Sequence, residues 1–266
     1  MRALQAVRTE PMRPFLAALG FLTILPTPGA PPLSDGDWGR ATAWYPAVGL
    51  LLGIILAALD WGLHLLLPGG VAAALLLAGW VALTGALHLD GFVDCCDALP
   101  VPVSRARRLE ILRDVHVGAF GLVGVVLLLL TKYTALAALP DSLHLATLLL
   151  VPTLARWTMT AAVLLYPYAR SEPGLGQKAK TGTGWQQLVV ATLTTLLVTA
   201  LAWWVGLEWM ALLLLVLAAL SAFLVAQWIR SRIGGLTGDA CGAICEWVEA
   251  ISLLAVIALA FAGGLP

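Results

Sequence analysis

Charged residues are scarce in this sequence. Only 11% of the 266 residues are Asp, Glu, Lys or Arg, whereas 61% are hydrophobic; soluble domains carry about 25% charged residues. The 15 basic and 15 acidic residues balance, which argues against a protein that binds nucleic acid. Strand-like alternation of apolar and polar residues is lacking too, and the long apolar runs exclude a β-barrel. We therefore expect an all-α, polytopic integral membrane protein, with residues 1–266 forming a single membrane-embedded domain.

Seven apolar runs are long enough to cross a membrane, which takes about 20 residues in a helix. They are, to within a few residues, Trp44–Leu67, Val71–Leu89, Gly118–Leu139, Leu143–Tyr166, Trp185–Val205, Leu207–Ile229 and Ala243–Gly263. A shorter run, Phe15–Leu25, follows a basic start and precedes a proline-rich loop. We expect it to form a short re-entrant or interfacial helix, with a signal peptide as the alternative.

The turns within each pair of spans are short and nearly uncharged, so the long loops should all lie on one side of the membrane. These loops are residues 1–43, 90–117, 167–184 and 230–242. Every Lys and Arg except Lys132 and Arg156 falls in them. The positive-inside rule therefore assigns the long loops to the cytoplasm.

The four cysteines form two close pairs, Cys95 with Cys96 and Cys241 with Cys245. Both pairs lie beside carboxylates in loops assigned to the cytoplasm, where thiols are kept reduced. A four-cysteine zinc site would need the usual CxxC spacing, which neither pair has. We favour a role in helix packing and keep zinc as the alternative.

Three aspartates stand close together where the second predicted span ends. Within the stretch Leu83–Leu99, these are Asp90, Asp94 and Asp97. At about 100° per residue, a helix places all three within an arc of roughly 60°. Like charges this close repel one another unless a cation lies among them, and Mg²⁺ prefers such oxygen ligands. The pattern predicts a Mg²⁺ site; the alternative is a solvated helix end.

A second acidic segment lies in the last long loop. The apolar run after Glu249 is too short to span a membrane, so the last helix should begin near Gly238. Asp239 and Glu246 then share a helix face, and Glu246 and Glu249 should lie near the membrane rim. Since both acidic segments belong to the same side, they could clamp one or two metal ions between them.

Basic and glycine-rich loops on this side suggest phosphate binding. The amphipathic stretch Arg105–Asp114 carries bases that suit phosphate oxygens or anionic lipid headgroups. The loop Gly174–Gly184 contains Lys178 and Lys180; it is either a flexible connection or a mobile flap over a nucleotide, and it lacks the P-loop pattern. The turn Gly234–Asp239 could bind a polyphosphate at a helix N-terminus or be a plain N-cap.

Three charged residues lie inside predicted spans, where charge is costly and often functional. Asp60 and Lys132 both fall in the outer halves of their spans, and we expect an ion pair between them that joins the first span to the third. Arg156 lies about ten residues, roughly 15 Å, from the cytoplasmic end of its span and is a candidate to reach the acidic residues.

The four histidines divide between the two sides of the membrane. His88 and His116 flank the acidic region, where single histidines are usually tolerated polar residues. His64 and His144 are expected on the opposite side, away from the acidic residues.

Several sequence blocks in combination resemble one family of enzymes. They are HLDGFVDCCDAL (His88–Leu99), RLEILRDVHVGAFG (Arg108–Gly121) with Lys132 downstream, GGLTGDACGAICE (Gly234–Glu246), and the shorter FLTILP (Phe21–Pro26) and YPAVG (Tyr45–Gly49). Together they resemble the adenosylcobinamide-GDP ribazoletransferases, also called cobalamin 5′-phosphate synthases, essentially from end to end. The pair Cys95-Cys96 departs from the small or hydroxyl residues common there and leaves the carboxylates unaffected.

The resemblance implies a Mg²⁺-dependent transferase of the bacterial inner membrane, with its catalytic site facing the cytoplasm. Such an enzyme joins adenosylcobinamide-GDP to α-ribazole or its 5′-phosphate in the final steps of cobalamin (vitamin B12) nucleotide-loop assembly, and it releases GMP. Its partners would be these substrates and the lipid bilayer. It could also form a homo-oligomer or a complex with other cobalamin-assembly enzymes.

As a hypothesis, the resemblance also assigns roles to residues of this chain. Asp90, Asp94 and Asp239 are expected to be catalytic. The expected Mg²⁺ ligands are Asp90, Asp94, Asp97, Asp239 and Glu246. The residues expected to bind substrate or phosphate are Arg113, Asp114, His116, Arg156, Lys178, Lys180 and Gly238.

Two other functions fit part of this sequence pattern. A CDP-alcohol phosphotransferase also displays an acidic, Gly-containing motif at a cytoplasmic membrane rim, but its usual DG-x2-AR followed by G-x3-D-x3-D is missing here. A secondary transporter could use Asp60, Lys132 and Arg156 as a relay. Its acids would be expected near the bilayer midplane, often in repeated halves, whereas the acids of this chain collect on one side.

Overall fold

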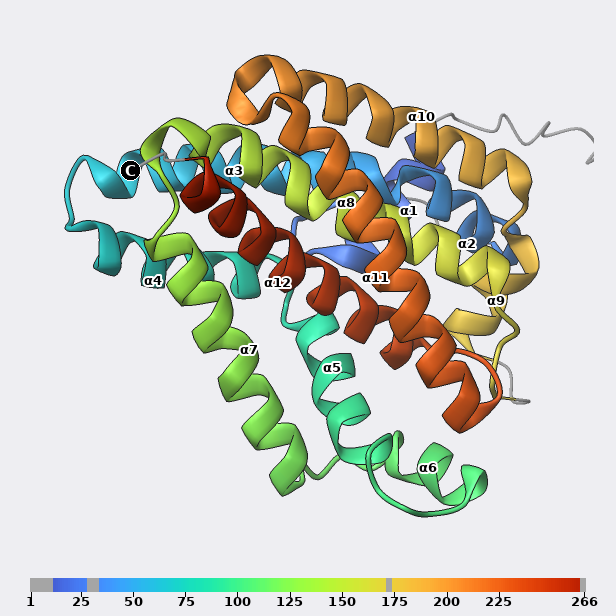
Figure 1. The fold of residues 1–266 in the computed structure, drawn as a ribbon. Helices are drawn as coiled ribbons and strands as arrows, with labels where there is room; N and C mark the ends of the chain where they lie inside the picture. The colour runs from blue at the N-terminus through green and yellow to red at the C-terminus, as the bar shows by residue number, and fades with distance from the viewer. Residues whose placement is uncertain (1–11, 28–33, 171–173, 264–266) are drawn as a thin grey trace, which may run out of the picture.

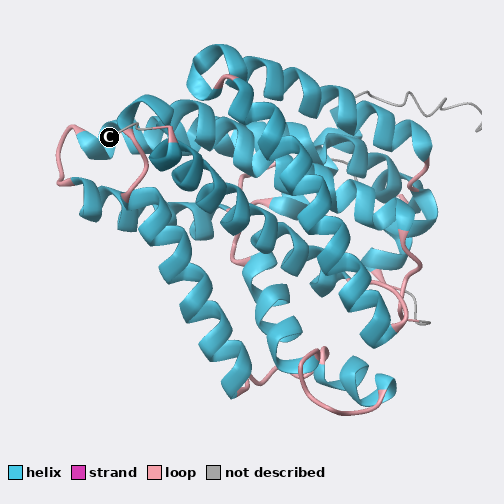
Figure 2. Cartoon of the chain, in the orientation of Figure 1, coloured by secondary structure: helices cyan, strands magenta, loops and turns pink. Residues whose placement is uncertain are grey.

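The chain folds into a bundle of helices, as Figures 1 and 2 show. The computed structural model describes residues 12–27, 34–170 and 174–263. Its α-helices are α1 (Met12–Leu22), α2 (Asp35–Ala41), α3 (Tyr45–His64), α4 (Gly69–Leu83), α5 (Leu87–Ala98), α6 (Arg105–Ile111), α7 (Ala119–Ala137), α8 (His144–Leu165), α9 (Leu175–Gly182), α10 (Trp185–Ala202), α11 (Trp209–Ile233) and α12 (Gly238–Ala262). Short turns of other helix types cover Thr42–Trp44, Asp141–Leu143 and Trp203–Leu207.

Within the described residues, six helical segments are long and apolar enough to cross a membrane, and a seventh is added if α4 and α5 count as one bent span. The six are Gly36–His64, Ala119–Ala137, Asp141–Leu165, Trp185–Leu207, Trp209–Ile233 and Gly238–Ala262. They confirm the expected polytopic, all-α architecture. The predicted short N-terminal helix corresponds to α1, which packs into the bundle through Ala17, Ala18, Leu19 and Leu22.

The predicted second span, Val71–Leu89, is not one continuous helix. α4 ends at Leu83, α5 begins at Leu87, and the two are bent by 90°. Gly85 and Ala86 adopt left-handed backbone conformations (φ 58° and 56°), which end a right-handed helix. The carbonyl of Leu83 accepts a hydrogen bond from the backbone N–H of Ile24 (2.9 Å). The segment after α1 therefore satisfies a backbone group that the break would otherwise leave unpaired.

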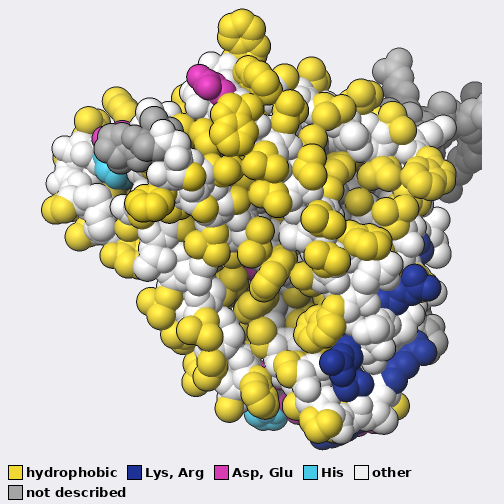
Figure 3. All heavy atoms as spheres, in the orientation of Figure 1, with side chains coloured by type: hydrophobic (Ala, Val, Ile, Leu, Met, Phe, Trp, Pro, Cys, Tyr) yellow, Lys and Arg dark blue, Asp and Glu magenta, His cyan; other side chains and the backbone are white. Residues whose placement is uncertain are grey.

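Helix α8 is the central helix of the bundle. It packs against α3, α10, α11 and α12, and 72% of its spanning window is buried, compared with 28% for α7 and for α10. α7 and α10 therefore present most of their surface outward. Figure 3 shows that hydrophobic side chains cover most of the face viewed, and that Lys and Arg gather at one end, around the C-terminal end of α11.

Four buried charged side chains tie α7, α8 and α12 together. Lys132 donates hydrogen bonds to Glu246 (2.8 Å) and to Glu249, and Arg156 donates to Glu249. All four residues are at most 5% exposed, and their charges balance two against two. The expected ion pair between Asp60 and Lys132 is wrong: Lys132 reaches α12 instead, and Asp60 pairs with histidine side chains.

Removing Lys132 should destabilise the fold strongly. In Lys132→Met, Glu246 and Glu249 stay buried but lose their shared cation, and breaking a buried pair in this way costs about 3–5 kcal/mol. We expect a clearly lower Tm for the purified protein in lipid nanodiscs. The matched control is Arg107→Met, which removes an exposed pair with Glu110 and should cost at most about 1 kcal/mol. Equal Tm values for the two variants would contradict the assigned role of the network.

Candidate active site

The N-terminal halves of α5 and α12 bring the two acidic segments together. They pack so closely that a Cβ on Gly91 would lie 2.7 Å from the carbonyl oxygen of Asp239, an approach that only glycine permits. Asp90 and Asp94 of α5 therefore stand near Asp239 of α12, and the charges of these carboxylates act on one another. The order of the spans predicted that both acidic segments lie on the same side of the membrane. The structure adds that α5 and α12 touch at Gly91, which brings the two segments close together.

Arg170 is the base that faces these acids. Its Nη2 donates to Oδ2 of Asp239 (2.7 Å), and its charge also acts on Asp94. Asp94 at the same time faces three other carboxylates, those of Asp90, Asp97 and Asp239. Negative charge therefore exceeds positive charge in this group, which is the condition under which carboxylates bind a divalent cation.

A short backbone pairing holds Arg170 in place. The N–H of Ala169 donates to the carbonyl of Leu236 (2.8 Å), and the N–H of Leu236 donates to the carbonyl of Pro167 (2.9 Å), which forms an isolated parallel bridge. The loop after α8 is thereby fixed to the turn before α12. Sequence reasoning counted Arg170 among the loop bases but did not select it, because its partner Asp239 is 69 residues away.

Asp97 holds the start of α7. Its two carboxylate oxygens accept hydrogen bonds from the backbone N–H groups of Gly118 and Gly121, each at 2.8 Å. Such N–H groups at a helix N-terminus have no partner within the helix, and the helix dipole favours a carboxylate there. Asp97 thus has a structural task of its own, and its role as a Mg²⁺ ligand stays a prediction.

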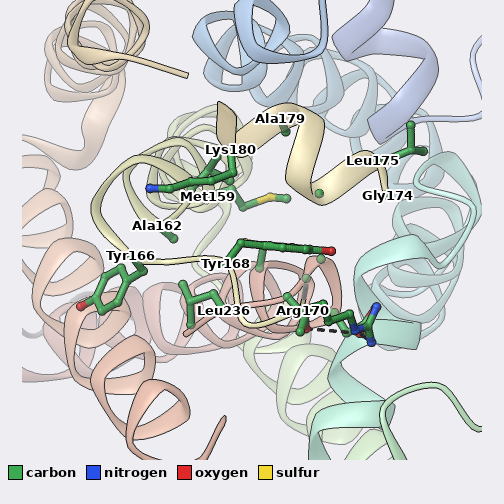
Figure 4. A pocket seen from close by; sticks show the side chains of 18 of the residues that line it. Met159, Ala162, Tyr166, Tyr168, Arg170, Gly174, Leu175, Ala179, Lys180 and Leu236 are labelled. Atoms are coloured by element: carbon green, nitrogen blue, oxygen red, sulfur yellow. Dashed lines mark hydrogen bonds and ion pairs between the residues drawn. The ribbon is translucent and has the colours of Figure 1, made fainter. Parts of the chain in front are cut away.

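A cavity of about 380 Å³ lies beside Asp90 and Asp239. Figure 4 shows it from close by, with Tyr168 lying between α9 and Leu236. Most of the lining is apolar or aromatic and includes Trp38, Tyr45, Met159, Tyr166, Tyr168 and Leu236; its charged groups are Asp90, Asp239, Arg170 and Lys180, and Gly238 at the start of α12 borders it as well. A mostly apolar cavity with a few convergent polar groups is the usual form of a small-molecule site.

The segment Gly174–Gly184, expected to be a flexible connection or a flap, is largely the helix α9, which forms one wall of this cavity. Lys180 lines the cavity, and its Nζ donates to the carbonyl of Leu164 (2.7 Å). Burial lowers the pKa of Lys180 and raises the pKa of Tyr168. Lys178 lies on the same helix and is half-buried. The segment is therefore a helix and not an irregular loop, and its role as a flap over a nucleotide stays a prediction.

Glu246 and Arg156 lie inside the helix bundle. Glu246 was expected near the membrane rim, but it is 5% exposed and accepts a hydrogen bond from Lys132 (2.8 Å); Arg156 is fully buried and donates to Glu249. The lining of the cavity includes neither residue. Their roles as metal ligand and phosphate-binding residue stay predictions, while their contacts show that both position α12.

His88 is a cavity residue that sequence reasoning missed. It is 1% exposed and lines the cavity. Nη2 of Arg156 lies 3.4 Å from Nδ1 of His88; because a guanidinium can only donate, Nδ1 accepts and Nε2 carries the hydrogen. Nε2 is buried and has no hydrogen-bond partner among the described residues, so its N–H is an unused donor beside the cavity. In the sequence, the only indication of this role was that His88 lies two residues before Asp90.

Arg113, Asp114 and His116 lie away from the cavity. Asp114 and His116 are exposed and bonded to each other, Oδ1 to Nδ1 at 2.7 Å, and this hydrogen bond lowers the pKa of Asp114. Arg113 borders a second hollow of about 400 Å³, together with Arg105 and Arg170. Arg170 lines both hollows. Of the predicted phosphate-binding bases, Lys180 lines the cavity and Arg113 the second hollow, whereas Lys178 and Arg156 line neither.

The sequence matches one family over nearly its whole length. A sequence model of the family described as Cobalamin-5-phosphate synthase matches residues 14–257. Proteins named adenosylcobinamide-GDP ribazoletransferase from Geotalea daltonii, a Roseiflexus species and Brevibacillus brevis are 38%, 36% and 35% identical to this chain. These matches cover 93%, 91% and 92% of this chain and 98%, 88% and 98% of the relatives. No solved structure shows a significant match.

The close approach at Gly91 gives a test of the packing between α5 and α12. In Gly91→Ala the new Cβ would overlap the backbone of Asp239, and overpacking of this kind costs about 1–3 kcal/mol, although alanine favours a helix. We expect a lower Tm in nanodiscs. Gly238→Ala is the matched control, because a Cβ there meets nothing within 4 Å, and its Tm should not fall. Identical Tm values for both variants would argue against the tight contact.

Proposed function

Because the chain belongs to the cobalamin-5-phosphate synthase family and is a transferase, we propose that it acts as an adenosylcobinamide-GDP ribazoletransferase. In this reaction the 3′-hydroxyl of α-ribazole, or of its 5′-phosphate, attacks the phosphorus that carries the cobinamide arm. GMP leaves, and adenosylcobalamin or its 5′-phosphate is formed. The observation that carries the proposal is the group of Asp90, Asp94 and Asp239, which has excess negative charge and lies beside a cavity.

We assign Mg²⁺ to Asp90, Asp94 and Asp239. Carboxylate oxygens are the ligands that Mg²⁺ prefers, and the charge on this group exceeds that of the base that faces it. Bound Mg²⁺ would neutralise the diphosphate and the charge that develops on GMP. Asp97 and Glu246 stay in the candidate set, but their oxygens already accept hydrogen bonds within the protein.

We assign the cavity to α-ribazole and not to the corrinoid. A volume of about 380 Å³ with aromatic side chains such as Tyr166 and Tyr168 on its walls suits a flat nucleoside base, whereas a corrin ring with its side chains is far larger. Asp90 and Asp239 line the same cavity, so either carboxylate is suited to accept the proton of the ribose hydroxyl.

We assign the phosphate groups of the GDP moiety to the boundary between the cavity and the second hollow. Arg170 lines both, and Arg105 and Arg113 border the second hollow. Guanidinium groups bind phosphate oxygens through paired N–H donors. They would hold the diphosphate against the acidic group and stabilise the departing GMP.

We infer that this site faces the cytoplasm of a bacterial inner membrane. The Lys and Arg side chains gather at one end of the face seen in Figure 3, and the loops that carry almost all basic residues also carry the acidic residues of the site. The positive-inside rule assigns that end to the cytoplasm.

The carboxylates should be essential for activity. Purified Asp90→Asn and Asp94→Asn proteins in nanodiscs are given adenosylcobinamide-GDP, α-ribazole 5′-phosphate and Mg²⁺, and released GMP is quantified by chromatography. We expect a loss of about 100-fold or more, because losing a charge-stabilising group typically costs that much. Glu208→Gln, an exposed change at the start of α11, is the control and should keep full activity. Full activity of the Asp variants at limiting Mg²⁺ would contradict the assignment of Mg²⁺ to these carboxylates.

His88 should contribute to α-ribazole binding through its Nε2–H. Loss of one hydrogen bond, worth about 1 kcal/mol, should raise KM for α-ribazole 5′-phosphate by roughly fivefold to tenfold in His88→Ala, with KM for adenosylcobinamide-GDP unchanged. In His88→Gln the side-chain amide still donates and should recover most of the loss. A rise in both KM values, or no recovery with glutamine, would point to a purely structural role.

A further inference from the structure

A second cluster of metal-binding side chains lies at the opposite end of α8 from the cavity. Asp60 and His64 belong to the last turns of α3, and His144 is the first residue of α8. One possible ligand atom from each lies within 4.8 Å of the other two. The cluster borders a hollow of about 740 Å³, which Trp61 and Asp141 also line, so an ion has room to enter.

Backbone carbonyls occupy one nitrogen of each imidazole. Nε2 of His144 lies 3.0 Å from the carbonyl oxygen of Leu139, and Nδ1 of His64 lies 3.0 Å from the carbonyl oxygen of Asp60. A carbonyl oxygen can only accept, so these two nitrogens carry the hydrogens. In the neutral rings, the other nitrogens, Nδ1 of His144 and Nε2 of His64, have lone pairs. Metal-binding histidines are commonly oriented in this way, by donating the second ring N–H to a carbonyl.

The buried carboxylate of Asp60 is only partly satisfied. Its Oδ2 lies 2.7 Å from Nδ1 of His144. Its Oδ1 lies 3.3 Å from Nδ1 of His64, but the hydrogen on that nitrogen points to a backbone carbonyl. Oδ1 therefore has no hydrogen-bond partner in the part of the chain that the structure describes, although Asp60 is only 6% exposed. A proton shared with His144 would explain the short contact but would leave Oδ1 unpaired. A cation held by all three side chains would satisfy it, as buried polar atoms normally require.

We propose that Asp60, His64 and His144 bind Zn²⁺ or a similar divalent transition-metal ion. Two imidazoles and one carboxylate are a common zinc ligand set that leaves a fourth position for water, and the hollow lies beside it. Mg²⁺ takes oxygen ligands instead, so this site differs in chemistry from the acidic group at the other end of the bundle. The ion ties the end of α3 to the start of α8, and the inference is independent of the proposed transferase reaction.

Zinc binding by the full-length protein tests the proposal. Protein in nanodiscs is freed of metal with a chelator and titrated with Zn²⁺; bound zinc is measured by mass spectrometry after desalting, and Tm is recorded. We expect one Zn²⁺ per chain at micromolar free zinc. Tm should rise by several degrees, because an ion that binds only the folded state stabilises it. An excess of Mg²⁺ should not displace the zinc.

Variants at each end of the bundle locate the bound ion. His64→Ala removes a ligand whose side chain is 33% exposed and should weaken zinc binding at least about tenfold; Asp60→Asn should do the same. His116→Ala is the matched control, because His116 also contacts a carboxylate at 2.7 Å but lies outside the cluster, and Cys96→Ser controls for thiol ligands. Unchanged zinc affinity in His64→Ala, or loss of the zinc in either control, overturns the proposal.

Discussion

The buried ion network of Lys132, Arg156, Glu246 and Glu249 constrains the rest of the structure. Charges inside an apolar bundle are tolerated only when they are paired, so α7, α8 and α12 must keep their relative positions for these pairs to form. α12 also carries Asp239 at its start, and α8 ends beside the cavity. The network therefore determines, from inside the bundle, where the acidic group and the cavity lie relative to each other.

The break between α4 and α5 determines which neighbour the α5 acids meet. If the second apolar run continued as one straight helix, Asp90 would lie on an extension of α4. The 90° bend instead turns α5 so that Gly91 packs against the start of α12. Backbone groups freed by such a break are costly in an apolar environment, and the N–H of Ile24 satisfies one of them. A short N-terminal helix thus supports the site from a distance.

Much of this fold is predictable from the sequence, because membrane thickness sets the length of each apolar run, and helix periodicity alone decides which face the α5 aspartates share. The break was not predictable, since Gly85 and Ala86 are hardly more polar than the run around them and hydropathy does not register it. The partners of Lys132 and Arg170 were not predictable either. They lie 69 to 117 residues away, and pairing over such separations depends on how the helices pack and not on any local pattern.

Two buried imidazoles, those of His88 and His144, show why residue type alone does not reveal what a histidine can bind. Arg156 donates to Nδ1 of His88, so the remaining nitrogen carries a hydrogen and suits an oxygen atom of a substrate. The carbonyl of Leu139 accepts from Nε2 of His144. In the neutral ring the remaining nitrogen, which faces Asp60 at 2.7 Å, has a lone pair and suits a cation. The tautomer, and with it the class of ligand, is set by whichever donor or acceptor the fold brings against the ring.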